Sequence, residues 1–150
     1  MAQTDTINDT DIDFGMLEES VGYRLRRAQM NFFAKFSEIC SDLGISPGLF
    51  SVLVIVEKNP GLTQTAVAQA LGNDRSAMVA AVDKLENMKL IERRPAKNDR
   101  RSYALFITKY GQEFFEMSSR KVRDYENTMI ARLHSDHEKD QLVDMLKRLS

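Results

Sequence analysis

Five basic residues lie close together in a segment of ten, between Glu92 and Arg101. Only Glu92 and Asp99 are acidic there, so the segment has a formal charge of +3. Such a cluster can bind phosphate groups, because lysine and arginine side chains neutralise phosphates and release their counterions. The five basic residues are Arg93, Arg94, Lys97, Arg100 and Arg101.

The sequence does not indicate catalysis or metal binding. It has no glycine-rich phosphate loop, no nucleophile elbow and no paired-histidine metal motif, so we expect neither an enzyme nor a cofactor. His134 and His137 lie beside Asp136 and Glu138, and we interpret them as surface residues of a turn. Cys40 is the single cysteine and is expected to be buried. A thiol-based redox switch through Cys40 is the alternative, although its acidic neighbours would not lower its pKa.

Two short helices joined by a turn are predicted just before the basic segment. Apolar residues at helical spacing predict a helix from Thr63 to Leu71 and a second helix with Asn73 or Asp74 as its N-cap. Gly72 fits the sharp turn of a helix-turn-helix. The inward stripe of the second helix is Met78, Ala81, Val82, Leu85 and Met88. Its outward face, the surface that a recognition helix presents to the major groove, is Arg75, Ser76, Val79, Ala80 and Asp83.

A β-hairpin is predicted after the second helix. Leu90-Ile91 begins one strand, and Pro95 to Arg100 is expected to be the connecting loop. The returning strand is predicted from the alternation of Tyr103, Leu105 and Ile107 with Ala104 and Phe106. The fold class predicted is therefore mainly α with a small β-hairpin wing, as in a winged helix-turn-helix.

The hairpin resembles the wing of the MarR (multiple-antibiotic-resistance regulator) family of transcription factors. The signature of that wing is Asp-x-Arg followed after five residues by Leu-Thr. Here it appears as Asp99-Arg100-Arg101 and then Ile107-Thr108. Two positions depart from the family pattern. Lys89 replaces a glycine after the recognition helix, and Ala80 replaces a basic residue on it.

This resemblance implies a transcriptional regulator, in our interpretation a repressor, that binds double-stranded DNA. Arg75 and Ser76 would contact bases or phosphates, and Arg100 or Arg101 would enter the minor groove. Asp99 would hold the wing by pairing with an arginine. The full set of DNA-binding residues that we predict is Thr63, Gln64, Thr65, Arg75, Ser76, Val79, Arg93, Arg94, Lys97, Asp99, Arg100 and Arg101.

Long amphipathic helices are predicted on both sides of the winged core, which covers residues 46–108. Apolar residues at intervals of three and four indicate one helix at about 15–43 and helical structure over 109–150, with a capping box at Ser135 and Glu138. A helix of 24 residues would be about 36 Å long, more than a domain of this size can cover. We therefore expect these helices to form a homodimer, as they do in proteins that this chain resembles.

The resemblance also implies control by a small-molecule effector. We expect it where the dimerisation helices meet the winged core, and the residues chosen as its lining are Tyr23, Arg27, Met30 and Phe50. An aromatic carboxylate or its CoA thioester would suit their rings and cation. The alternatives left open are an architectural DNA-binding protein indifferent to sequence, a protein-interaction module and the redox regulator.

Composition sets the remaining expectations. At 150 residues and 43% hydrophobic content, one domain at 14–150 is expected, after a disordered acidic tail at 1–13. The net charge of -1 hides an uneven distribution, because residues 21–150 hold all 21 Lys and Arg against 16 acids, a charge of +5. The sequence shows neither a signal peptide nor an apolar run long enough for a membrane span, so we expect a cytoplasmic protein.

Overall fold

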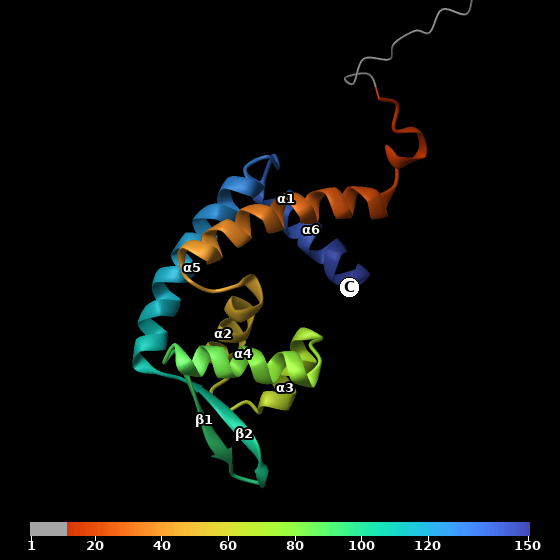
Figure 1. The fold of residues 1–150 in the computed structure, drawn as a ribbon. Helices are drawn as coiled ribbons and strands as arrows, with labels where there is room; N and C mark the ends of the chain where they lie inside the picture. The colour runs from red at the N-terminus through yellow and green to blue at the C-terminus, as the bar shows by residue number, and fades with distance from the viewer. Residues whose placement is uncertain (1–11) are drawn as a thin grey trace, which may run out of the picture. The chain divides into compact units, whose positions relative to one another are not determined.

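The computed structural model describes residues 12–150, the side chains of residues 99 and 100 excepted. The fold is mainly helical with one two-stranded hairpin, as predicted (Figure 1). The predicted tail at 1–13 lies outside the described residues except for positions 12 and 13. The elements are η1 (Gly15–Leu17), α1 (Val21–Asp42), α2 (Pro47–Lys58), α3 (Gln64–Leu71), α4 (Arg75–Asn87), β1 (Ile91–Ala96), β2 (Asp99–Ile107), α5 (Lys109–Ile130) and α6 (Asp136–Leu149).

The chain divides into two compact units, Met1–Ala34 and Lys35–Ser150. In the first unit the long helix begins at Val21, later than the predicted start at residue 15. Gly15 has a φ of +52°, so a right-handed α-helix cannot run through it, and a short 3₁₀ turn forms instead. The side chain of Ser20 accepts a hydrogen bond from the amide of Tyr23 at 3.3 Å, which satisfies one free donor at the start of α1.

In the second unit α2 forms the centre of the core. The β-branched stretch Phe50–Val56 favours a strand by propensity, yet it is helical. Pro47 occupies the first turn, and the side chain of Ser46 accepts from the amide of Leu49 at 3.2 Å. Burial explains how packing overrides propensity: the buried residues of α2 are Leu49, Phe50, Val52, Leu53 and Val56.

Two capped helices, α3 and α4, pack on this core as the predicted helix-turn-helix. The Thr63 side chain accepts from the amide of Ala66 at 3.2 Å, and Asp74, one of the two predicted caps, accepts from Ala77 at 2.8 Å. The predicted inward stripe of α4 is confirmed, since Met78, Val82 and Leu85 are buried and Ala81 and Met88 pack against them.

The hairpin is tighter than expected. Pairing runs from Ile91 opposite Ile107 to Ala96 opposite Asp99, so the predicted loop from Pro95 to Arg100 is wrong and only two residues connect the strands. An irregularity between Pro95 and Ala96 permits this, because it shifts the register at a proline that cannot donate to the ladder.

The segment before α3 pairs with β2 like a short third strand of the wing. Thr63 bridges Ala104, the amide of Gly61 donates to the Leu105 carbonyl at 2.9 Å, and the Leu105 amide donates to Leu62 at 3.0 Å. Ala104 and Leu105 are consequently both buried, although alternation predicted opposite environments for them.

A crowded junction connects α4, the wing and α5. Lys89 adopts the left-handed conformation with a φ of +61°, where the family pattern has glycine. The hydroxyl of Thr108 donates to the Lys89 carbonyl at 2.6 Å and accepts from the amide of Gly111 at 2.9 Å. Thr108 therefore caps α5 and also fixes the end of the wing.

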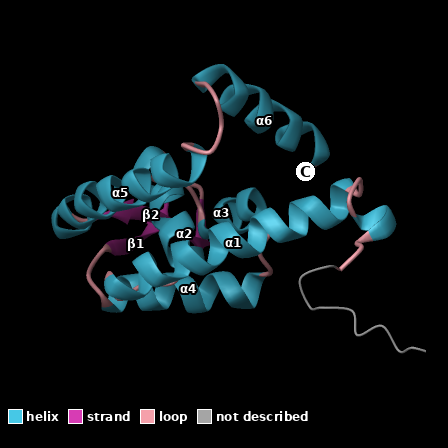
Figure 2. Ribbon diagram, turned by 90° about the horizontal axis from the view of Figure 1, so that it is seen from above, coloured by secondary structure: helices cyan, strands magenta, loops and turns pink. Residues whose placement is uncertain are grey.

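The C-terminal helices are only partly covered. Tyr125 of α5 stacks on Phe36, with ring centroids 6.2 Å apart. Ser135 caps α6 by accepting from Glu138 at 3.2 Å, while the Glu138 carboxylate accepts from the amide of His134 at 2.7 Å, one residue before the position that a capping box predicts. Every residue of α6, which the structure describes in full, is exposed or half-buried, and α6 stands apart from α3 and α4 (Figure 2).

Candidate nucleic-acid interface

The outer face of α4 is free of the core for its whole length. Arg75, Ser76, Val79, Ala80 and Asp83 are all exposed, as the helical pattern predicted. Since Asp74 satisfies the amide of Ala77, the first turn of α4 is fixed independently of any ligand. This face has the size and shape of an element that enters a major groove.

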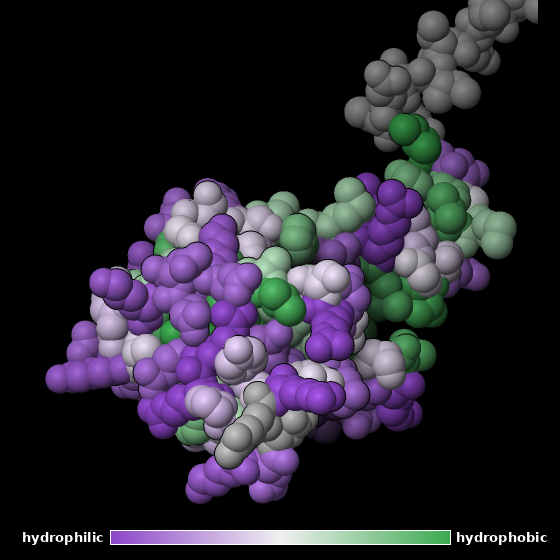
Figure 3. All heavy atoms as spheres, turned by 60° about the horizontal axis from the view of Figure 1, so that its bottom comes forward, coloured by the Kyte–Doolittle hydropathy of each residue, from purple (hydrophilic) through white to green (hydrophobic). Residues whose placement is uncertain are grey.

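A hollow of about 500 Å³ lies between this face, the start of α3 and β2. It brings together residues predicted separately from two helices and the wing. Those predicted residues are Gln64, Thr65, Arg75, Val79 and Arg101. The surrounding surface is largely hydrophilic when the wing end is turned forward (Figure 3).

The hollow also contains residues that the sequence analysis missed as site residues, among them Gln69, Asn73, Ser102 and Tyr103. Tyr103 is 51% exposed, whereas Leu105, its predicted companion in the alternating series, is fully buried. The available signal was its polar hydroxyl, since a tyrosine on a wing can donate to phosphate oxygens.

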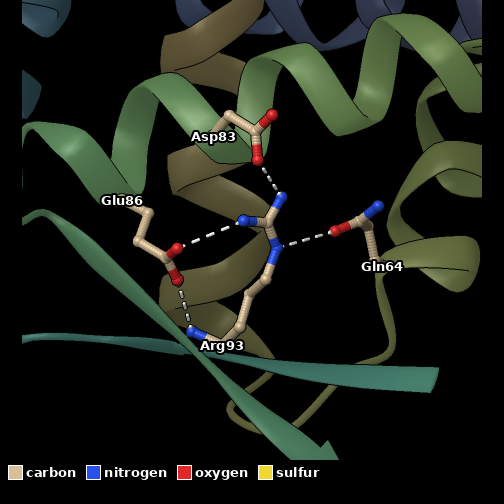
Figure 4. A network of polar contacts seen from close by, with 4 residues as sticks. All are labelled: Gln64, Asp83, Glu86 and Arg93. Atoms are coloured by element: carbon tan, nitrogen blue, oxygen red, sulfur yellow. Dashed lines mark hydrogen bonds and ion pairs between the residues drawn. The ribbon is translucent and has the colours of Figure 1, made fainter. Parts of the chain in front are cut away.

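Arg93 is directed inward, toward the helices (Figure 4). Its guanidinium donates to Asp83 at 2.6 Å, to Glu86 at 3.2 Å and to the side-chain oxygen of Gln64 at 3.2 Å. Its own amide donates to the second oxygen of Glu86 at 3.0 Å, and its side chain is only 16% exposed. Arg93 therefore connects β1 to both helices of the helix-turn-helix.

This network also neutralises two acidic side chains near the interface. Asp83 and Glu86 would repel DNA phosphates if they were unpaired. Their ion pairs with Arg93 offset that repulsion, and the aromatic ring of Tyr103 lies under the same guanidinium at 5.8 Å. The cation that charge counting assigned to DNA thus neutralises acids on the recognition helix.

The other basic wing residues differ in their surroundings. Arg94 pairs with Glu92 and lies over the ring of Phe106 at 4.1 Å, whereas Lys97 is exposed in the two-residue turn. Arg101 is exposed at the edge of the hollow. The predicted pairing of Asp99 and the predicted role of Arg100 concern side chains outside the described part of the chain.

Of the predicted DNA-binding residues at the start of α3, Thr63 and Gln64 already have hydrogen-bond partners within the protein. The Thr63 oxygen already caps the helix, and the Gln64 oxygen accepts from Arg93. Each retains donor hydrogens, on the hydroxyl and on the amide nitrogen, that can reach a phosphate. Thr65 is exposed.

The residues predicted to line an effector site belong to different units. Tyr23, Arg27 and Met30 are in the first unit. Tyr23 is half-buried with its ring 6.1 Å from that of Phe14, and the other two are exposed. Phe50 belongs to the second unit, where its ring is buried against Phe36 at 5.8 Å. This set stays a prediction.

Cys40 is a free and fully buried thiol, as expected. Burial raises the pKa of Cys40, so its reactive thiolate form is less populated than in an exposed cysteine. This environment disfavours the redox alternative.

Within residues 12–150 no group of three or more His, Cys, Asp or Glu side chains could hold a metal ion. Over the same residues no single helix is long and apolar enough to cross a membrane, and α1 with α2 meets that criterion only as a bent pair.

Comparisons with known proteins agree with this geometry. The profile of the MarR family matches residues 43–102. A putative transcriptional regulatory protein for the hcr operon of Thauera aromatica is 38% identical over 136 residues, which cover 90% of this chain and 81% of the relative. The HTH-type transcriptional regulator BilQ of Clostridium symbiosum is 30% identical, over 89% of this chain and 92% of BilQ.

The chain is also similar to solved structures of a transcriptional repressor. The transcriptional repressor CouR bound to a 23-mer DNA duplex is 32% identical, with a TM-score of 0.86 over 93% of this chain and 98% of that one. CouR bound to p-coumaroyl-CoA is 31% identical, with a TM-score of 0.79 over 93% of this chain and 97% of CouR.

Proposed function

This chain belongs to the MarR family and is a transcriptional regulator, not an enzyme, and we propose that it is a repressor that binds a pseudo-palindromic operator as a homodimer. The observation that carries the proposal is the exposed face of α4, which shares one hollow with the start of α3 and the basic wing. Support comes from CouR, a 32% identical repressor whose structure was solved with a DNA duplex.

In this proposal α4 enters the major groove and the wing follows the adjacent backbone. Arg75 and Ser76 in the first turn contact base edges or phosphates, because N-terminal residues of a recognition helix reach deepest. Thr63, Gln64 and Thr65 bind the backbone at the start of α3. Lys97 and Arg101 supply wing cations near the minor groove.

The homodimer is proposed from apolar surface that one copy leaves uncovered. On α6, Leu142, Val143, Leu146 and Leu149 form a stripe, and each is between 38% and 67% exposed. A second copy would cover this stripe with its own, as a two-fold interface requires. Such a dimer would place two α4 helices about 34–36 Å apart, one turn of DNA.

Release by a small ligand is the regulatory part of the proposal. The ligand class is an aromatic carboxylate or its CoA thioester, supported by the 31% identical CouR bound to p-coumaroyl-CoA. Binding would favour a spacing of the two α4 helices that no longer matches one turn of DNA. Such a regulator would act in the cytoplasm, where its DNA is.

Fluorescence anisotropy with the DNA upstream of its own gene tests the proposal. We expect tighter binding to this duplex than to a scrambled one, and release by one aromatic acid or CoA thioester. Equal affinity for both duplexes would contradict sequence-specific repression and favour an architectural DNA-binding protein. Specific binding that no compound disturbs would contradict the ligand model alone. Sedimentation at the same concentrations tests the dimer.

A further inference from the structure

The outward face of α4 changes character along its length. Its first turn carries the polar Arg75 and Ser76, and its third turn carries Asp83, whose carboxylate is already bound to Arg93 at 2.6 Å. Between them lie Val79 and Ala80, which are both exposed and have side chains without a polar atom. The middle of this face therefore offers DNA only methyl groups.

Val79 has the position needed to touch a base. It follows Arg75 by four residues, so the two side chains lie on the same face one turn apart. Val79 and Arg75 both line the 500 Å³ hollow, and Val79 also lines a second hollow beside Tyr103 and Arg93. With 38% of its surface exposed, Val79 is an apolar residue between the exposed polar residues Ser76 and Asp83.

Major-groove chemistry narrows what Val79 can recognise. The edges of guanine, adenine and cytosine present donors and acceptors, which lose hydrogen bonds to water when an aliphatic side chain covers them. Thymine alone among the four bases presents a methyl group, on C5, that can pack against a valine without such a loss. One carboxylate oxygen of Asp83 already accepts from Arg93, and this ion pair holds the Asp83 side chain against β1.

We propose that Val79 selects a thymine in each half of the operator by packing against its 5-methyl group. This inference rests on the proposed function, since it requires α4 in the major groove. It assigns base selection in the middle of α4 to apolar contact, and leaves hydrogen-bonded recognition to Arg75 and Ser76.

Replacement of single thymines by deoxyuridine tests the inference, because it removes only the 5-methyl group and keeps base pairing. Each thymine of the bound upstream duplex is replaced in turn, and affinity is measured for the full-length protein and for Val79→Ala. At one thymine in each half we expect the wild-type Kd to rise about fourfold, as expected for one buried methyl group. Val79→Ala should show less than about a twofold change at those positions.

Two further variants act as controls. Ser76→Ala should weaken binding to every duplex but keep the wild-type ratio of thymine to deoxyuridine affinity. Val79→Thr retains one γ-methyl group and should keep part of that ratio. All variants are exposed substitutions on a capped helix, and circular dichroism checks that each is folded.

The outcomes separate the two proposals. Specific binding by the wild type with no deoxyuridine effect, or an unchanged effect in Val79→Ala, would overturn this inference and leave the proposed function intact. Equal binding of the thymine operator and a scrambled duplex would overturn both.

Discussion

The guanidinium of Arg93 on β1 lies 2.6 Å from the carboxylate of Asp83 on α4, and this ion pair connects the wing to the recognition helix. Glu86 and Gln64 bind the same guanidinium, so one side chain sets the position of the wing against both helices. We expect Arg93 to affect DNA binding by positioning the wing and by neutralising Asp83 and Glu86, without itself contacting a phosphate.

Arg93→Ala should therefore weaken DNA binding without changing its dependence on salt. The substitution leaves Asp83 and Glu86 unpaired near phosphates and frees the wing. The slope of log K against log salt counts phosphates contacted, and Arg93 contacts none in this account. Arg93→Lys should weaken DNA binding similarly, since an ammonium group lacks the planar guanidinium that can bind several partners at once. A slope reduced by about 1 for each copy would instead show a phosphate contact.

Arg101→Ala should also weaken DNA binding, but it should change the dependence on salt. Arg101 is exposed at the edge of the hollow, and we expect it to reach the DNA backbone or minor groove. Its removal should weaken binding to all duplexes and reduce the salt slope by about 1 per copy. Anisotropy titrations between low and physiological salt measure both quantities. An unchanged slope and affinity would exclude Arg101 from the interface.

Lys89→Gly should stabilise the protein. Lys89 has a φ of +61°, which glycine adopts without the steric cost that a side chain adds, about 1 kcal/mol. We expect a gain of about 1 kcal/mol in the free energy of unfolding, measured in urea. Lys84→Gly is the matched control, because Lys84 lies in a regular turn of α4, the helix that precedes Lys89, and its replacement should cost about 1 kcal/mol. A loss at both positions would contradict the strain at Lys89.

Gly111→Ala should strongly destabilise the junction of the wing and α5. An added methyl group would overlap the Leu90 carbonyl oxygen and lie 2.8 Å from its carbon and 2.9 Å from Ile107. Because the oxygen and carbon belong to backbone, relief requires α5 to move, at a cost of about 3 kcal/mol. Gly48→Ala is the control, since its nearest atom would be the Ser46 hydroxyl at 3.9 Å. Equal stability of the two variants in urea would refute the close approach.

Stability should fall as the pH rises above about 9. Burial raises the pKa of Cys40 above its ordinary 9.0, and burial together with Glu126 raises the pKa of Tyr125 above its ordinary 10.0. The folded protein then holds protons that the unfolded chain has already released, so deprotonation favours unfolding in this range. The free energy of unfolding of Cys40→Ala, measured in urea, should decline less steeply between pH 9 and 10 than that of the wild type. Identical pH profiles for both proteins would rule out a contribution from Cys40.

The sequence predicted those features that depend on neighbours along the chain. The caps at Asp74 and Ser135 need only a side chain and an amide three residues away, and the stripe of α4 needs only helical periodicity. The features it missed depend on distant segments. Ala104 is buried because the segment at Thr63 adds to the wing, which no alternation within β2 reveals.

In the candidate site, too, the sequence predicted what depends on local periodicity and missed what depends on contacts between distant segments. The sequence placed Arg75, Ser76 and Val79 on one exposed face correctly. Charge counting grouped Arg93 with the wing cations, because it cannot tell a guanidinium that faces solvent from one bound to acids on another element. Only the packing of β1 against α4 distinguishes the two.

A hydroxyl-radical footprint on the DNA upstream of the gene tests the central claim most directly. The proposed dimer predicts two protected regions related by a two-fold axis, with centres about 10 base pairs apart on one face of the duplex. A single protected region, or uniform protection without symmetry, would contradict two recognition helices bound one turn apart.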